Sequence, residues 1–172
     1  MTVATRILVV AAFAAVFGAC SGSDCGSHPV EFLDSGYPPG STGLNVQFAI
    51  DPNVAKKLDD PSRGPFVGQV FHSEDVNSLG PTNGAVPLGD ITVDDLDLPD
   101  DGSTTEVEFH ISPVPALPVT ILGFVDTDGN RNEDDPQPDR GDPVTLPGDN
   151  EFQLVADHQN LVTVFFGLLN PL

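Results

Sequence analysis

Apolar side chains alternate with polar or small ones along several short stretches of the chain, which is the pattern of half-buried β-strands. The clearest case is residues 44–50, where Leu44, Val46, Phe48 and Ile50 are each separated by one such residue. Successive side chains of a strand point to opposite faces, so this spacing gathers the apolar set on one face. The pattern predicts about seven strands, over residues 44–50, 66–72, 91–98, 106–111, 119–125, 152–156 and 161–168.

Some stretches depart from simple alternation, and they predict a central strand, a short edge strand and a helical turn. Residues 119–125 are apolar throughout, which indicates a central strand, and residues 66–72 are apolar on both faces. Residues 30–33 are long enough only for a short edge strand. Residues 53–58 are the one segment that favours a helical turn.

The segments between the predicted strands are rich in turn-forming residues. The chain has 172 residues, with 17 Gly, 17 Pro and 20 Asp against 6 Glu. Asp, Gly and Pro favour turns and caps over helix interiors. We therefore expect an all-β domain over residues 44–172, a two-layer β-sandwich of the immunoglobulin-like or transthyretin-like type.

Residues 1–19 have the features of a cleaved signal peptide. Arg6 supplies a positive charge, and the thirteen residues 7–19 are all apolar or small. As a helix they would span only about 20 Å, which is less than the roughly 30 Å of a bilayer core. We therefore expect export of the chain and removal of this segment.

The signal peptide ends in Phe17-Gly18-Ala19-Cys20. Small residues directly before a cysteine at this place resemble the lipobox of bacterial lipoproteins. The resemblance implies that Cys20 carries the lipid and anchors the protein to the cell envelope. Ser21 in place of Asp favours the outer membrane by the same resemblance. The alternative is ordinary secretion with a disulfide between Cys20 and Cys25, a bridge that closes a very short loop and adds little stability.

Residues 20–43 are expected to connect the anchor to the folded domain. After Cys20 the segment is rich in Ser, Gly and Pro, which is typical of a flexible tether. The predicted organisation is therefore a signal peptide at 1–19, a lipidated cysteine and tether at 20–43, and the β-sandwich at 44–172.

The net charge excludes one class of partner. Six Lys and Arg face 26 Asp and Glu, which gives a formal charge of −20. Such a surface repels phosphate backbones, so we expect no nucleic-acid binding. It also disfavours docking to anionic lipid through a basic patch. Contact with the membrane is thus expected only through the lipid on Cys20.

An acidic run directly after the predicted central strand is the most distinctive chemical feature. Oxygen-bearing side chains occupy every second position of this run, which predicts a metal site made of Asp126, Asp128, Asn130, Asn132 and Asp134. Ca²⁺ takes six to eight oxygen ligands. Gly129 allows the tight turn that would point these side chains at one centre.

The acidic run resembles the beginning of the calcium loops of EF-hand, dockerin and thrombospondin-type repeats. Arg131 stands where the EF-hand pattern has glycine, and Gln137 where it has a bidentate glutamate. The expectation is a calcium loop on a β-sandwich, without the EF-hand fold. The alternative is a solvated turn without metal, because Asp-x-Asp-Gly-Asn is also a good turn sequence.

A broader resemblance covers residues 117–168. A strand is followed by Asp-x-Asp-x-Asn, then a Pro-rich turn ending at Gly141-Asp142-Pro143, and then two final strands. This order is similar to that of small exported bacterial domains with a transthyretin-like sandwich. The resemblance implies a fold and no activity.

No catalytic motif stands out in the sequence. There is no Gly-x-Ser-x-Gly elbow, no Gly-rich phosphate loop and no His-Glu-x-x-His. We expect a non-catalytic, lipid-anchored module with a structural or interaction role and an unidentified protein or small-molecule partner. The alternatives are a small envelope hydrolase, a protease inhibitor and a lipoprotein that binds a small ligand.

Overall fold

The computed structural model describes residues 31–33, 42–58, 63–111, 116–132, 134 and 136–171. The predicted signal peptide, the predicted lipidation site Cys20 and most of the predicted tether lie outside the described residues. Among the residues that are described, no helix has the length and apolar character needed to span a membrane.

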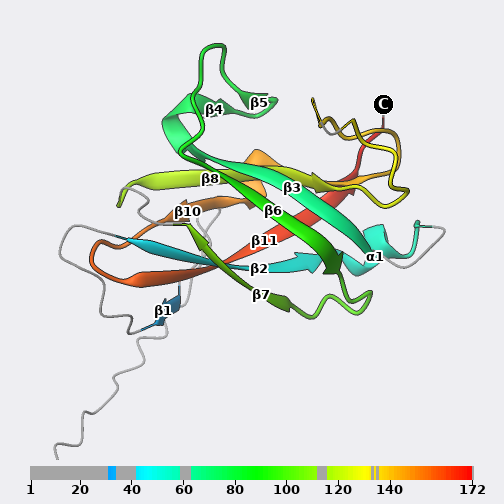
Figure 1. Cartoon of the computed structure of the whole chain (residues 1–172), viewed down its shortest axis with the longest axis horizontal. Helices are drawn as coiled ribbons and strands as arrows, with labels where there is room; N and C mark the ends of the chain where they lie inside the picture. The colour runs from blue at the N-terminus through cyan, green and yellow to red at the C-terminus, as the bar shows by residue number, and fades with distance from the viewer. Residues whose placement is uncertain are drawn as a thin grey trace, which may run out of the picture.

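Nine of the described strands form one sheet, and two more form a small hairpin (Figure 1). The strands of the large sheet are β1 (Glu31–Leu33), β2 (Gly43–Ile50), β3 (Arg63–His72), β6 (Gly89–Asp97), β7 (Thr105–Ile111), β8 (Pro118–Val125), β9 (Pro143–Thr145), β10 (Glu151–Gln153) and β11 (Gln159–Leu169). The hairpin consists of β4 (Val76–Asn77) and β5 (Gly80–Pro81). Short helical turns are α1 (Pro52–Ala55), η1 (Ser73–Asp75) and η2 (Pro147–Asp149).

The large sheet curls so that its two halves face each other. The main strand order is β6-β3-β8-β9-β11-β2-β7, with β1 beside β11 and β10 beside β8. Strands β6, β3 and β8 form one layer and β11, β2 and β7 the other, with β9 between them (Figure 1). Neighbouring strands are antiparallel except β11 and β2, which run parallel. The predicted all-β, sandwich-like fold is confirmed.

All seven predicted strands are present, with ends that differ by a few residues. The edge strand expected near residues 30–33 is β1, and the expected helical turn is α1. Asp51 caps α1, because its Oδ1 accepts a hydrogen bond from the Asn53 N–H at 2.6 Å. Strand β9 and the β4–β5 hairpin were not evident from the sequence pattern.

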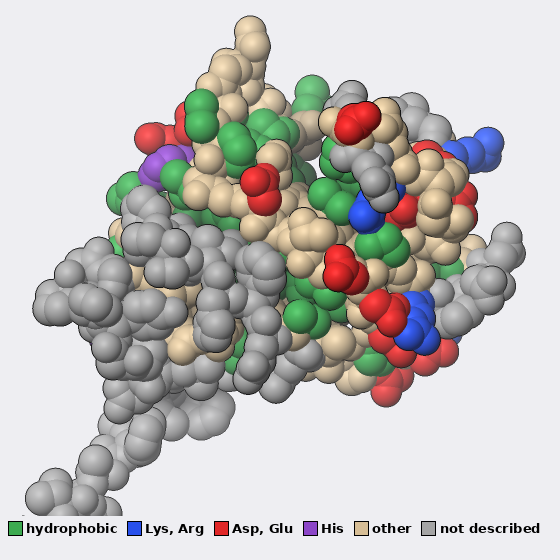
Figure 2. All heavy atoms as spheres, viewed as in Figure 1, with side chains coloured by type: hydrophobic (Ala, Val, Ile, Leu, Met, Phe, Trp, Pro, Cys, Tyr) green, Lys and Arg blue, Asp and Glu red, His purple; other side chains and the backbone are tan. Residues whose placement is uncertain are grey.

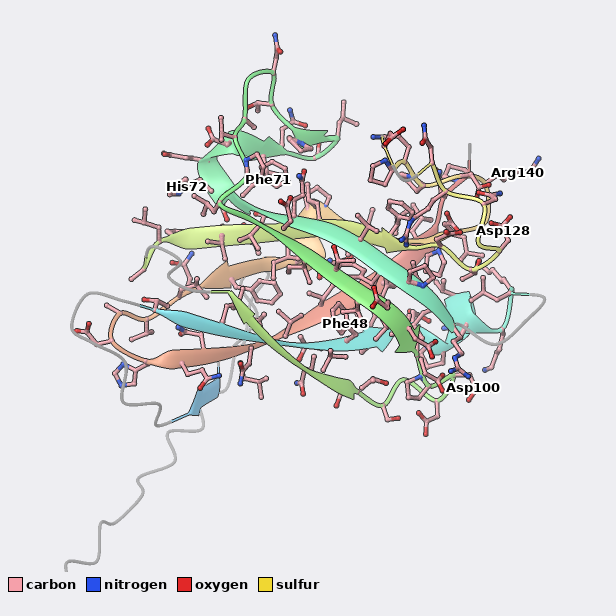
Figure 3. The ribbon with its side chains drawn as sticks, in the orientation of Figure 1. Phe48, Phe71, His72, Asp100, Asp128 and Arg140 are labelled. Atoms are coloured by element: carbon pink, nitrogen blue, oxygen red, sulfur yellow. The ribbon has the colours of Figure 1, made fainter. Side chains whose placement is uncertain are left out.

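The core lies between the two layers and is centred on three phenylalanines. Phe48 of β2, Phe66 of β3 and Phe166 of β11 are all fully buried. The ring centroids of Phe48 and Phe66 are 4.8 Å apart, and those of Phe66 and Phe166 are 5.8 Å apart, both in edge-to-face geometry. Figure 3 shows Phe48 between the layers. Because the rings come from both layers, they hold the curled sheet closed.

A buried asparagine connects the turn around η2 to the last strand. Asn150 is fully buried, and its Nδ2 donates to the carbonyl oxygens of Leu146 and Phe165, each at 3.0 Å. Its Oδ1 accepts from the Phe165 N–H at 2.7 Å. These bonds satisfy three main-chain groups beside β11, so Asn150 replaces strand pairing that the turn interrupts.

The edge strand β6 carries several acidic side chains. Asp94, Asp95 and Asp97 are exposed on this strand. Arg63 of β3 forms a salt bridge with Asp95 through two hydrogen bonds, Nε to Oδ1 at 2.7 Å and Nη2 to Oδ2. Charges on an edge strand oppose pairing with another chain.

Candidate metal centre

The acidic loop leaves the sheet at the end of β8 and returns to it at the start of β9. Asp126 is the first residue after β8, and Asp142 is the last residue before β9. Asp128 lies two residues beyond Asp126, in the part of the loop that projects from the sheet (Figure 3). The loop therefore begins and ends with an aspartate at the same end of the sheet.

Three aspartates of this loop converge. Each of Asp126, Asp128 and Asp142 offers a carboxylate oxygen, and the three oxygens lie within 4.8 Å of one another. Asp126 is 2% exposed and Asp142 is 3% exposed, whereas Asp128 is exposed to solvent. The cluster thus has two buried carboxylates at its base and one at its open side.

Asp126 shapes the first turn of the loop. Its Oδ1 accepts hydrogen bonds from the N–H groups of Gly129 at 2.8 Å and Asn130 at 3.2 Å, and its Oδ2 accepts one from the Arg131 N–H at 3.4 Å. Gly129 has a φ of 72°, a conformation that favours glycine. The chain after β8 therefore folds around the Asp126 carboxylate.

Asp142 holds the other side of the loop. Its Oδ1 accepts from the Thr127 N–H at 3.2 Å, and its Oδ2 accepts from the Asp139 N–H at 3.1 Å. Burial raises the pKa of Asp142, and the nearby charges of Asp139 and Asp126 raise it further; the two N–H donors oppose this. The folded environment of this carboxyl group therefore favours its protonated form.

Contacts from elsewhere in the chain fix the two ends of the loop. The Asn170 N–H donates to the Asp142 carbonyl at 2.8 Å, and Asn170 Nδ2 donates to the Pro138 carbonyl at 2.9 Å. On the other side, a Cβ built at Gly64 would lie 2.0 Å from the Asp126 carbonyl oxygen. Only glycine allows β3 to approach Asp126 this closely.

Of the remaining predicted ligands, Asp134 is not among the three converging carboxylates, and Asn130 and Asn132 are located by their hydrogen bonds. Asn130 Nδ2 donates to Asp128 Oδ2 at 2.8 Å and also to Asp139 Oδ2, so it links two carboxylates. Asn132 Oδ1 accepts the Asp134 N–H at 3.1 Å, and both residues are exposed. Asn130 is therefore adjacent to the cluster, while Asn132 and Asp134 form a separate local turn.

The carboxylates of the cluster repel one another when they are ionised. Two unit charges 4.8 Å apart repel by about 0.9 kcal/mol in water and about 3.5 kcal/mol at an effective dielectric constant of 20. Within the part of the chain that the structure describes, no Lys or Arg forms a salt bridge with any of the three. The hydrogen bonds above form the turn, and a cation would remove the repulsion that remains.

The donor set consists of carboxylate oxygens alone. Hard oxygen ligands suit Ca²⁺, Mg²⁺ and Mn²⁺, whereas zinc and copper sites use imidazole or thiolate groups. Among the described residues, the cluster contains no His or Cys. The arrangement can therefore hold a hard divalent cation.

Asp142 is the member of the cluster that the sequence pattern did not predict. It lies 16 residues after Asp126 along the chain, beyond the regular alternation that suggested the site. Its clue lies in the fold: Asp142 directly precedes β9, a strand that was not evident from the sequence. Two aspartates at the ends of adjacent strands lie close in space, whatever the length of the loop between them.

No family model matches the chain, and neither the curated proteins nor the solved structures give a significant match.

Proposed function

We propose that the protein is a non-catalytic module of the bacterial cell envelope, anchored through lipid on Cys20, whose acidic loop binds Ca²⁺. The observation that carries the calcium site is the convergence of Asp126, Asp128 and Asp142. The anchor rests on the lipobox-like sequence before Cys20. The role of the module is structural or in binding a partner, since neither the sequence nor the site offers catalytic chemistry.

Three carboxylates supply between three and six of the oxygens that Ca²⁺ requires, because each can bind through one or both atoms. Asn130 is the nearest further candidate, through its side-chain oxygen after rotation of the amide. Water would complete the shell at the exposed side, where Asp128 lies. We therefore assign the ligands as Asp126, Asp128 and Asp142, with Asn130 beside them.

Calcium fits this loop better than magnesium. Mg²⁺ demands near-ideal octahedral geometry and gives up its water reluctantly, whereas Ca²⁺ accepts irregular cages of carboxylates. Extracellular calcium modules typically bind at about 10⁻⁴ to 10⁻³ M. A site of this strength would be filled in a calcium-rich medium and empty in a poor one, so the stability of the module would follow the medium.

Thermal unfolding tests the calcium site. With a dissociation constant of about 1 mM, calcium at about 10 mM would stabilise the fold by about 1.4 kcal/mol. For a chain of this size the melting temperature would rise by about 3–6 °C. Chelator should abolish the rise, and Mg²⁺ at the same concentration should give a smaller one. Identical melting curves with calcium and with chelator would reject the site.

Metabolic labelling with a radioactive fatty acid tests the anchor. Wild type should incorporate label in a bacterial host that processes lipoproteins, and Cys20→Ser should not. Cys25→Ser is the matched control and should be labelled as wild type. Label retained by Cys20→Ser would reject Cys20 as the anchor, and an unlabelled wild type would favour ordinary secretion.

A further inference from the structure

A groove runs over the outer face of the sheet, on the side away from the phenylalanine core. The β4–β5 hairpin and the loop after β8 both rise from this side (Figure 1). The hairpin forms one wall, and residues 136–138 with residues 146–147 form the other. The cavity between them has a volume of about 810 Å³. Pockets of roughly 300–1,000 Å³ are the usual size for small-molecule ligands.

The floor of the groove is apolar. It is formed by outward-facing residues of β3 and β8, chiefly Val67, Leu122 and Phe124. Phe71 of β3 lies below the hairpin, as Figure 3 shows. Burial of such surface favours a ligand with an apolar body.

The hairpin carries an apolar side chain to the rim of the groove. Leu79 is 96% exposed. The hairpin that bears it is ordered by its own bonds: the Leu79 N–H donates to Asn77 Oδ1 at 2.8 Å, and the Thr82 N–H donates to the Asp75 carbonyl at 2.8 Å. The ordered hairpin therefore keeps the Leu79 side chain exposed to solvent at the edge of the cavity, where a bound ligand would cover it.

The charged and polar side chains that line the groove favour a ligand with positive charge. Asp90 of β6 supplies a carboxylate, which Gln69 orients by donating from Nε2 to Oδ1 at 2.8 Å. Among the described residues that line the cavity, none is Lys, Arg or His. With a chain charge of −20, an anion is repelled and a cation is attracted. Charge complementarity thus points to a ligand with a protonated amine.

The strands that form the floor, β3 and β8, have no free edge with which a peptide could pair. β3 is paired with β6 and β8, and β8 is paired with β3 on one side and with β9 and β10 on the other. An extended peptide recognises a sheet by pairing with an open edge. Laid on this face, a peptide would leave main-chain groups unpaired. The floor therefore suits a small molecule better than a peptide.

We propose that this groove binds a small amphiphile that combines an apolar, ring-sized body with a protonated amine. The body lies against Val67, Leu122 and Phe124 and beneath Leu79. The ammonium group donates to the carboxylate of Asp90. This binding does not depend on the calcium site, and it gives the module a specific small-molecule ligand.

Three probes with one common body and different charge test the proposal on the purified full-length chain. They are 2-(1-naphthyl)ethylamine, the neutral 2-(1-naphthyl)ethanol and the anionic 1-naphthylacetate. Titration calorimetry in chelator measures affinity without calcium, and amide chemical shifts locate the binding. The amine should bind about fivefold more tightly than the alcohol, the gain typical of a partly exposed ion pair. The acetate should bind most weakly, and the shifts should centre on β3 and β8.

Two pairs of surface variants assign the binding to the groove. Asp90→Asn should remove the preference for the amine over the alcohol, whereas Asp94→Asn, which removes the same charge elsewhere on β6, should keep it. Leu79→Ser should weaken all three probes. Val86→Ser is its control, because Val86 is 71% exposed and does not line the groove. All four residues are exposed, so the variants should fold.

Several results would overturn the proposal. They are no saturable binding of any probe, shifts that centre outside the groove, or tighter binding of the acetate than of the amine. An equal loss of amine preference in Asp90→Asn and Asp94→Asn would also overturn it, since the effect would then reflect net charge and not the groove.

Discussion

Asp142 and Thr127 close the acidic loop on itself. The Thr127 N–H and its hydroxyl both donate to Asp142 Oδ1, at 3.2 and 3.3 Å, from positions fifteen residues apart in the chain. This contact places the Asp142 carboxylate beside Asp126, the neighbour of Thr127, although both carboxylates are buried. The same hydrogen bonds that order the loop therefore concentrate negative charge within it.

The stability of the metal-free protein should depend on pH through Asp142. Its pKa is raised in the folded state, so the proton is held more tightly than in the unfolded chain. The resulting stabilisation is fully present below the unfolded pKa of about 3.9 and is lost as the pH rises through the folded value. In chelator, the melting temperature of wild type relative to Asp142→Asn should fall as the pH rises from about 4 towards neutrality.

Two comparisons sharpen this pH test. Asp134→Asn, an exposed residue of the same loop, should track wild type at every pH. Saturating calcium should abolish or reverse the trend, because a bound cation favours the ionised carboxylate. If the difference in melting temperature between wild type and Asp142→Asn stays constant with pH in chelator, the pKa of Asp142 is not raised by folding and this prediction is wrong.

Gly64→Ala should destabilise the protein by about 2 kcal/mol, the usual cost of overpacking. The new Cβ would lie 2.0 Å from the Asp126 carbonyl oxygen, so β3 and the start of the loop must move apart. Chemical denaturation measures the change. Gly148→Ala is the control, since a Cβ there meets nothing within 4 Å, and its free energy of unfolding should stay within about 0.5 kcal/mol of wild type. Equal stability of both variants would disprove the close approach at Gly64.

Asn150→Ala should cost about 2–4 kcal/mol of unfolding free energy. The substitution leaves the Leu146 carbonyl and both main-chain groups of Phe165 without their side-chain partner, in a buried position. Urea denaturation with a constant m-value would report it. Asn83→Ala, at an exposed turn, should change little. A loss below about 0.5 kcal/mol for Asn150→Ala would show that the bonds contribute nothing.

The strands were predictable where the side-chain pattern is regular. Alternation over residues 44–50 located β2, and the continuous apolar run at 119–125 located the central β8. The same pattern gave the inward face: Leu44, Val46 and Phe48 are all buried. The locations of these strands and of their buried faces follow from the local spacing of apolar side chains, and the tertiary contacts agree with that spacing.

The parts that escaped prediction depend on contacts between distant segments. Strand β9 is three residues long and begins at Pro143, so its sequence looks like the end of a turn. It becomes a strand because β11 and β8 flank it. The β4–β5 hairpin has two residues in each strand, too few for any period to appear. The groove depends on this hairpin and was therefore invisible in the sequence.

The carboxylate cluster was predictable in part for the same reason. Alternating oxygens in the run after β8 identified Asp126 and Asp128, both members of the cluster. The third carboxylate comes from Asp142, which tertiary structure brings back to the loop. The local pattern extended the predicted ligand set to Asn132 and Asp134, whereas the third carboxylate of the cluster is that of Asp142, directly before β9.

Calcium titration calorimetry on three proteins tests the central claim most directly. Wild type should bind one Ca²⁺ per chain, and Asp128→Asn should bind it about tenfold more weakly because one charged ligand is lost. Asp134→Asn removes the same charge from the same loop, outside the cluster, and should bind within about twofold of wild type. No heat of binding in wild type at millimolar calcium, or an equal loss in both variants, would contradict a site built on Asp126, Asp128 and Asp142.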